Sequence, residues 1–142
     1  MVGVEALARL EHPEYGVLSP SCFLSQVAKL GLMSEFYRSM LAKATTAMSL
    51  LNGTIQLSMN INKTLLDGPL YEHTVEICRV TNFPFEALTL ELTEEQAYHL
   101  TPVALRNLAR LSLLGVSFAI DDFGTGYASL EQLIDLPISE LK

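Results

Sequence analysis

The stretch Phe118-Ala119-Ile120-Asp121-Asp122-Phe123-Gly124-Thr125-Gly126-Tyr127 joins an apolar segment to two adjacent carboxylates and a glycine-spaced loop. The apolar run 116–120 is typical of a buried parallel strand, and α/β folds bind ligands at the C-terminal ends of such strands. Two carboxylates there are costly to bury without a cation beside them, and hard divalent cations prefer carboxylate oxygens. A plain turn is the alternative, because Asp and Gly are common turn residues. This segment alone does not decide between a metal site and a turn.

The composition restricts the class of protein. The chain has 142 residues, which suits one domain, and 49% of them are hydrophobic, with a mean hydropathy of +0.30. The formal net charge of −7 argues against binding of a DNA or RNA polymer through a basic surface. A polyanionic substrate would therefore need metal ions or a local arginine or lysine.

The cysteines and the lack of targeting signals indicate the compartment. Cys22 and Cys78 form no CxxC pair and have no histidine at metal-ligand spacing, which favours free thiols in a reducing cytoplasm. The sequence has no recognisable signal peptide and no apolar run long enough to span a bilayer, so we expect a cytoplasmic segment without membrane contact. Both termini interrupt predicted elements abruptly, and we expect the domain to be cut at both ends.

Predicted strands and helices alternate along the chain. Apolar runs rich in β-forming residues predict four strands, at 2–7, 55–61, 88–93 and 116–121. Apolar periodicity bounded by Ser, Pro, Gly and Asn predicts helices, at 20–30, 34–51, 70–80, 102–114 and 128–136. We expect a polar loop over 11–19, a short turn over 63–66 and a new element from 138. This alternation predicts parallel strands joined by right-handed helical crossovers.

Each predicted strand has one apolar face and one polar face, because successive side chains point to opposite faces. Every polar face carries a small residue and, two positions later, a residue with an oxygen ligand. The oxygen ligands are Glu5, Asn60, Glu91 and Asp121. A barrel interior with a polar site at its C-terminal mouth fits this pattern better than an open doubly wound sheet, which tends to be apolar on both faces. The repetition favours the metal site over the turn, although Asn60 or Glu91 alone could have a structural role.

These residues lie in motifs that resemble the EAL family of bacterial phosphodiesterases, which hydrolyse cyclic di-GMP. The matching segments are Glu5-Ala6-Leu7-Ala8-Arg9, Ser58-Met59-Asn60-Ile61-Asn62, Glu91-Leu92-Thr93-Glu94, Asp121-Asp122-Phe123-Gly124-Thr125-Gly126 and Lys142. The resemblance spans essentially the whole chain. It implies an α/β fold that is a partial TIM-type (β/α)8 barrel, with about four parallel strands, crossover helices and the start of a fifth strand. It also implies that residues 1–142 lack the family's antiparallel first strand and its C-terminal strands.

The resemblance implies a two-metal site with Mg²⁺ or Mn²⁺. The first ion would be bound by the four residues at the strand ends: Glu5, Asn60, Glu91 and Asp121. Asp121 and Asp122 would serve the second ion. Two such ions about 3.5–4 Å apart activate water and neutralise the charge of a phosphodiester under attack.

Four other positions receive roles from the resemblance. Arg9 would contact a substrate phosphate, and Leu7 would line the cleft for the guanine nucleotide. Lys142 would contact the attacking water. Glu94 would hold the loop 123–129, through which the family couples dimerisation to the metal site. We expect a homo-oligomer, also because an incomplete barrel leaves two strand edges open to further pairing.

Two functions other than hydrolysis stay open. The chain could be a non-catalytic module that binds cyclic di-GMP or another protein, or a different metal-dependent barrel such as an enolase-like lyase. The intact ligand positions favour an enzyme over a receptor, and the Asp121-Asp122 pair with Asn60 fits a two-metal hydrolase better than a lyase. Because the family's later strands supply a further metal-site glutamate, we expect residues 1–142 alone to be weakly active or inactive.

Overall fold

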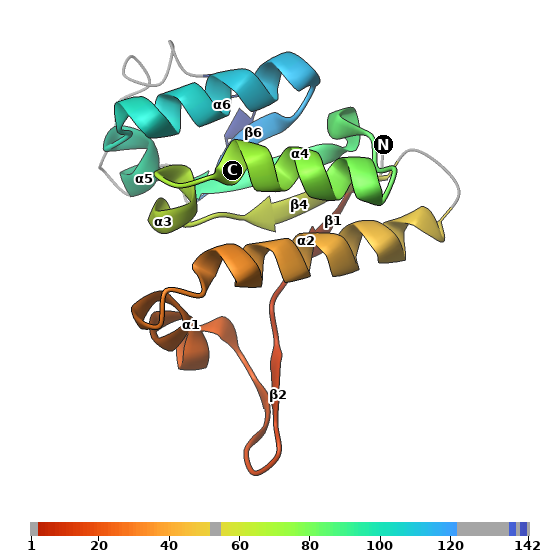
Figure 1. The fold of residues 1–142 in the computed structure, drawn as a ribbon, viewed down its shortest axis with the longest axis vertical. Coiled ribbons are helices and arrows are strands. Elements are labelled where there is room, and N and C mark those ends of the chain that lie inside the picture. Colours follow the sequence, from red (N-terminus) through yellow and green to blue (C-terminus); the bar gives the residue numbers. More distant parts are fainter. Residues whose placement is uncertain (1–2, 52–54, 122–136, 139, 142) are drawn as a thin grey trace.

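One parallel sheet forms the centre of the structure, a computed structural model that describes residues 3–51, 55–121, 137–138 and 140–141 (Figure 1). Its strands are β1 (Gly3–Ala6), β4 (Gln56–Asn60), β5 (Leu88–Thr93), β6 (Ser117–Asp121) and β7 (Glu140–Leu141). Their order in the sheet is their order along the chain, and each neighbouring pair is parallel. Such an order is typical of a barrel wall, whereas a doubly wound sheet reverses its direction of growth. The predicted α/β fold, with four parallel strands and the start of a fifth, is confirmed.

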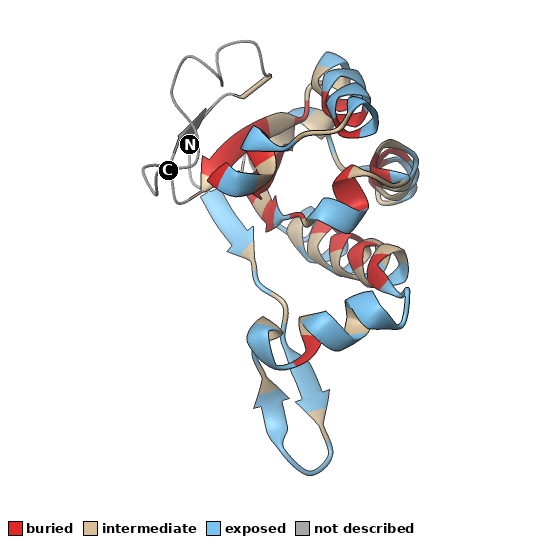
Figure 2. Ribbon diagram, turned by 90° about the vertical axis from the view of Figure 1, so that its left-hand side faces the viewer, coloured by how far each residue is buried: buried red, intermediate tan, exposed pale blue. Residues whose placement is uncertain are grey.

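Four long helices lie between the strands in the sequence. They are α1 (Pro20–Lys29), α2 (Met33–Ser49), α4 (Leu70–Val80) and α6 (Pro102–Leu114). Helices α2, α4 and α6 lie next to one another along one face of the sheet (Figures 1 and 2). All four helices begin and end within two residues of the predicted bounds. The predicted helix 128–136 lies outside the described residues.

The core lies between the sheet and this helical layer, where the buried residues gather in Figure 2. The predicted apolar faces of β4, β5 and β6 are 3% exposed or less; their residues are Leu57, Met59, Leu88, Leu90, Leu92, Phe118 and Ile120. Strand β1 differs, because Val4 on its predicted apolar face is 39% exposed. β1 is one of the two edge strands of the described sheet, and its neighbour there is β4.

Burial also raises the pKa of two side chains in the core. The hydroxyl of Tyr37 on α2 forms a 2.7 Å hydrogen bond with Oγ1 of Thr74 on α4. Burial raises the pKa of Tyr37 well above its usual value, and the hydrogen bond with Thr74 offsets part of that rise. Burial likewise raises the pKa of Cys78 on α4 to about 11. Both groups therefore remain protonated near neutral pH.

A β-hairpin replaces the polar loop predicted over 11–19. Strands β2 (Leu10–His12) and β3 (Gly16–Leu18) pair in antiparallel register and project away from the sheet (Figures 1 and 2). The side chain of His12 closes the turn, because its Nδ1 accepts hydrogen bonds from the backbone N–H groups of Glu14 and Tyr15 at 3.0 and 3.2 Å. The loop prediction was wrong: Pro13 and Gly16, which are typical turn residues, lie at a hairpin turn in which Gly16 has a positive φ of +74°.

Short helices follow β4 and β5 directly. The predicted turn over 63–66 is the helix α3 (Lys63–Leu66), which the side chain of Asn62 caps by accepting from the N–H of Leu65 at 3.0 Å. Helix α5 (Glu94–Tyr98) was not predicted, and a 3-10 turn, η1 (Phe85–Ala87), precedes β5. Because α3 and α5 begin so close to the strand ends, the chain leaves the sheet just beyond the candidate ligand residues.

Candidate functional site

The strand register puts the predicted ligand residues on one face of the sheet. Asn60 on β4 is the direct register partner of Glu91 on β5. Glu5 on β1 is the register partner of the residue two positions before Asn60. Asp121 on β6 is the register partner of the residue two positions after Glu91. Residues two positions apart on a strand share a face. Four adjacent strands therefore present three carboxylates and one amide on the same side.

Asn60 and Glu5 are in direct contact. Nδ2 of Asn60 donates a hydrogen bond to Oε1 of Glu5 at 3.0 Å, and both side chains are exposed. The contact connects the ends of β1 and β4 through side chains, in addition to the backbone ladder. Two oxygen-bearing groups of the predicted site are thus held together at the edge of the described sheet.

Two of the predicted site carboxylates are deeply buried. Glu91 near the end of β5 is 2% exposed, and Glu94 at the start of α5 is 1% exposed. Removing a carboxylate from water is costly and requires compensating interactions. Buried acidic groups close to a polar strand end are more frequent at functional sites than in an ordinary core. Asp121 is half-buried.

The donor set is the chemical kind that Mg²⁺ and Mn²⁺ prefer, since carboxylate and amide oxygens are hard ligands. Among residues 3–51, 55–121, 137–138 and 140–141, no three His, Cys, Asp or Glu side chains form a cluster that could hold a metal ion by themselves. The proposed set includes the amide of Asn60, and it includes Asp122, which lies outside the described residues. Lys142 lies outside them as well.

The two predicted substrate-contact residues lie just beyond β1. Leu7 is 54% exposed. Arg9 is exposed, and its Nη1 donates to the carbonyl of Ala8 at 2.7 Å. A guanidinium binds phosphate well, and the substrate contact of Arg9 stays a prediction.

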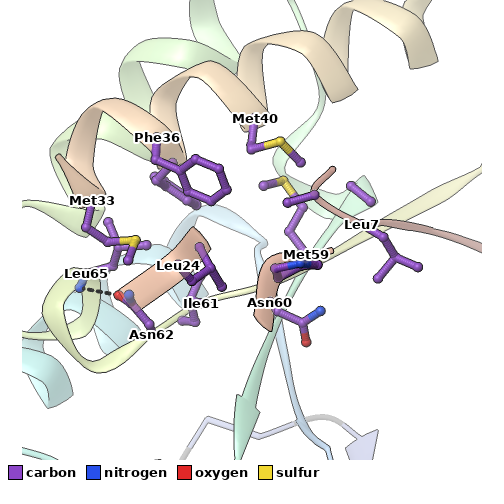
Figure 3. A pocket seen from close by; sticks show the side chains of 14 residues that line it. Leu7, Leu24, Met33, Phe36, Met40, Met59, Asn60, Ile61, Asn62 and Leu65 are labelled. Atoms are coloured by element: carbon purple, nitrogen blue, oxygen red, sulfur yellow. Dashed lines mark hydrogen bonds between the residues drawn. The ribbon is translucent and has the colours of Figure 1, made fainter. Parts of the chain in front are cut away.

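Sequence reasoning missed a pocket of about 260 Å³ next to Asn60 (Figure 3). It lies between the ends of β1 and β4 and the helices α1 and α2, and Leu7 is part of its wall. Four residues of α2 line the opposite wall: Met33, Phe36, Tyr37 and Met40. Their spacing places them on one helix face, which predicts contact with the core and gives no sign of a pocket.

Comparisons with known proteins identify the family of the chain. Residues 1–142 match the family model of the EAL domain. The chain belongs to the EAL domain family. The EAL chain is 31% identical over 146 aligned positions to the cyclic di-GMP phosphodiesterase RocR of Pseudomonas aeruginosa, covering 100% of this chain and 37% of RocR. It is 37% identical over 150 positions to the bifunctional diguanylate cyclase/cyclic di-GMP phosphodiesterase MucR of the same organism, covering 100% of this chain and 22% of MucR.

The fold of the EAL chain is that of the TIM-type barrel found in solved EAL domains. The complex of the PaMucR phosphodiesterase with c-di-GMP matches with a TM-score of 0.89 and 35% identity, over 99% of this chain and 59% of that chain.

The EAL chain spans well under half the length of RocR and MucR. EAL phosphodiesterases generally depend on divalent metal ions. None of the described helices combines the length and apolarity needed to cross a lipid bilayer.

Proposed function

We propose that this chain is part of an EAL phosphodiesterase that hydrolyses cyclic di-GMP to linear pGpG with Mg²⁺ or Mn²⁺. The observation that carries this proposal is the shared face of the four oxygen-donor residues, Glu5, Asn60, Glu91 and Asp121, at the ends of four adjacent strands. The relatives named above support the reaction, because RocR, MucR and PaMucR are all named as phosphodiesterases.

In this proposal the metal ions are held by those four residues together with Asp122. Divalent ions supply Lewis acidity, which activates water and offsets the negative charge of a phosphodiester. The pair formed by Asn60 and Glu5 keeps two of the donor groups in contact before a metal binds. Pre-arranged donors reduce the ordering that binding would otherwise require.

The other candidate residues have separate roles in the proposal. Arg9 binds a phosphate of the substrate, because its positive charge attracts an anion that the net charge of −7 of the chain repels. Leu7 makes an apolar contact with a guanine nucleotide. Lys142 contacts the attacking water, and Glu94 orders the loop 123–129.

Self-association and a cytoplasmic location belong to the same proposal. The edge of β1 carries the exposed Val4, and an edge strand of this kind pairs readily with another chain. A homo-oligomer would cover that edge. Cys22 and Cys78 are free thiols, which is compatible with a reducing compartment.

The test combines turnover and binding. The chain is incubated with cyclic di-GMP and Mn²⁺, and linear pGpG is quantified by chromatography; binding is measured by calorimetry with Ca²⁺ in place of Mn²⁺. We expect slow formation of pGpG that Asp121→Asn abolishes. Glu35→Gln removes the same charge from an exposed position on α2 and should leave turnover unchanged.

Other outcomes discriminate between the functions. Binding without product agrees with the weak or absent activity expected of residues 1–142 alone, and it would favour the non-catalytic module only if a chain with the family's later strands also formed no product. Neither binding nor product, in a chain whose thermal unfolding is cooperative, would contradict the proposed function.

A further inference from the structure

Gln96 connects the two strand ends that carry Asn60 and Glu91. Its Nε2 donates a hydrogen bond to the carbonyl of Ile61 at 3.2 Å, and its Oε1 accepts one from the backbone N–H of Thr93 at 2.8 Å. Ile61 directly follows Asn60, and Thr93 lies two residues after Glu91. One half-buried side chain therefore spans the ends of β4 and β5.

Both backbone groups of Ile61 have a hydrogen-bond partner, and Gln96 provides one of the two. The N–H of Ile61 donates to the carbonyl of Glu91 at 3.1 Å, while the carbonyl of Ile61 accepts from Gln96. Buried backbone groups require such partners, and Ile61 is buried where the chain leaves the sheet. The backbone next to Asn60 is therefore held by one contact to β5 and one contact to α5.

The amide nitrogen of Gln96 does more than helix capping requires. Thr93 Oγ1 accepts from the N–H of Gln96 at 3.1 Å, which completes a capping box at the start of α5. A glutamate serves equally well at that position of a capping box, because only an acceptor is needed. The donor Nε2 is the part of the side chain that reaches the neighbouring strand.

We propose that Gln96 is a positioning residue that sets the separation of Asn60 from Glu91, and so the affinity of the site for divalent metal. The inference rests on the proposed function. Ligands from different strands must be held within about 0.5 Å of their binding geometry, and groups that orient ligands without touching the metal typically change metal affinity by about 10–100-fold when removed.

The experiment compares Gln96→Glu with Gln56→Glu. Gln96→Glu keeps the acceptor for the N–H of Thr93 and removes the donor to Ile61. Gln56 provides a matched control, because its Nε2 donates to the carbonyl of Glu86 at 2.8 Å at the opposite end of β4. Both changes add one negative charge to the chain, and added negative charge by itself favours cation binding.

Mn²⁺ affinity is measured by calorimetry, and thermal unfolding in EDTA reports on stability. We expect Gln96→Glu to weaken Mn²⁺ binding about tenfold despite its added charge, and Gln96→Ala to do the same. Gln56→Glu should leave the affinity unchanged. Amide hydrogen exchange at 60–62 should accelerate in both Gln96 variants and stay unchanged in Gln56→Glu.

The outcomes separate this inference from the proposed function. If the wild-type chain binds Mn²⁺ and both Gln96 variants bind it equally tightly, the inference is overturned and the proposed function stands. If the wild-type chain binds no Mn²⁺, the proposed metal site is overturned and the inference with it. An equal loss of affinity in Gln56→Glu would also overturn the inference, because the effect would then be general to the sheet.

Discussion

The side chains of Asn60 and Glu5 are joined by a 3.0 Å hydrogen bond, although 55 positions separate them in the sequence. The donor is the amide of Asn60 and the acceptor is the carboxylate of Glu5. An aspartate at position 60 would have no such donor. The contact thus explains physically why an amide, and not a fourth acidic group, suits this strand end in the absence of metal.

Asn60→Asp should make the stability of the chain depend on metal. Without metal, two carboxylates would then lie close together, and we expect a loss of about 1 kcal/mol because both side chains are exposed. Mn²⁺ should restore more stability to the variant than to the wild type. Thermal unfolding in EDTA and in Mn²⁺ measures both effects. Asn62→Asp, which keeps the cap of α3, should show no such dependence, and equal behaviour of the two variants would contradict the prediction.

Tyr37→Phe should destabilise the contact between α2 and α4. The change removes the 2.7 Å hydrogen bond and leaves Oγ1 of Thr74 in a fully buried position. We expect a loss of about 1–2 kcal/mol, measured by urea unfolding. Tyr71→Phe is the control, because it keeps the ring that lies 3.6 Å from the guanidinium of Arg110. A loss of similar size in both variants would show that the hydrogen bond with Thr74 is not the source of the lost stability.

Gly115→Ala should cost more stability than Gly31→Ala. Both glycines have positive φ, +112° for Gly115 and +70° for Gly31. A Cβ on Gly115 would lie 3.0 Å from Cγ of Glu86, whereas a Cβ on Gly31 meets nothing within 4 Å. We expect about 2 kcal/mol for Gly115→Ala and about 1 kcal/mol for Gly31→Ala in chemical unfolding. A larger loss of stability in Gly31→Ala than in Gly115→Ala would show that contact with Glu86 does not determine the cost.

The burial of Cys78 should make the chain less stable at alkaline pH. Its pKa is about 11 in the folded chain, against 9.0 for the ordinary thiol. The unfolded chain therefore loses this proton first, and the free energy of unfolding falls as the pH rises from 9 to 11. Unfolding curves for the wild type and Cys78→Ala across this range measure the effect. Because Cys78 also contributes to the raised pKa of Tyr37, the comparison is repeated in a Tyr37→Phe background, where identical slopes would rule out a contribution from Cys78.

Val4→Lys should reduce self-association of the chain. Val4 lies on an edge strand of the described sheet, and a lysine on such an edge opposes pairing with another strand. Light scattering should give a lower mass for the variant than for the wild type. Val103→Lys introduces the same charge at a residue of α6 that is equally exposed, 41% against 39%, and should leave the mass unchanged. A wild-type chain that is already monomeric would contradict the predicted oligomer.

The strands and the shared face of Glu5, Asn60, Glu91 and Asp121 could be predicted because strand alternation is a local property of the sequence. Their register was not predictable in this way. It depends on contacts between segments about 30 to 55 residues apart, and the bond between Asn60 and Glu5 follows from that register. The roles assigned to Arg9, Leu7, Lys142, Asp122 and Glu94 rest on the family resemblance and stay predictions.

The features that were not predicted differ in whether the sequence contained a signal for them. Helix α5 was predictable, since Thr93 and Gln96 have the spacing of a capping box. The bond from Gln96 to Ile61 was not, because the sequence does not show which carbonyl lies beside a side chain. The contact of His12 that closes the hairpin was missed for a similar reason.

The identical order of the strands in the sheet and along the chain has a consequence for synthesis on the ribosome. Each new strand, as it emerges, finds its neighbour already made, because the preceding strand has left the ribosome first. The sheet therefore grows at one edge, from β1 through β4 and β5 to β6. The acidic strand ends are added one at a time, so the nascent chain accumulates negative charge at its binding edge in the order of translation.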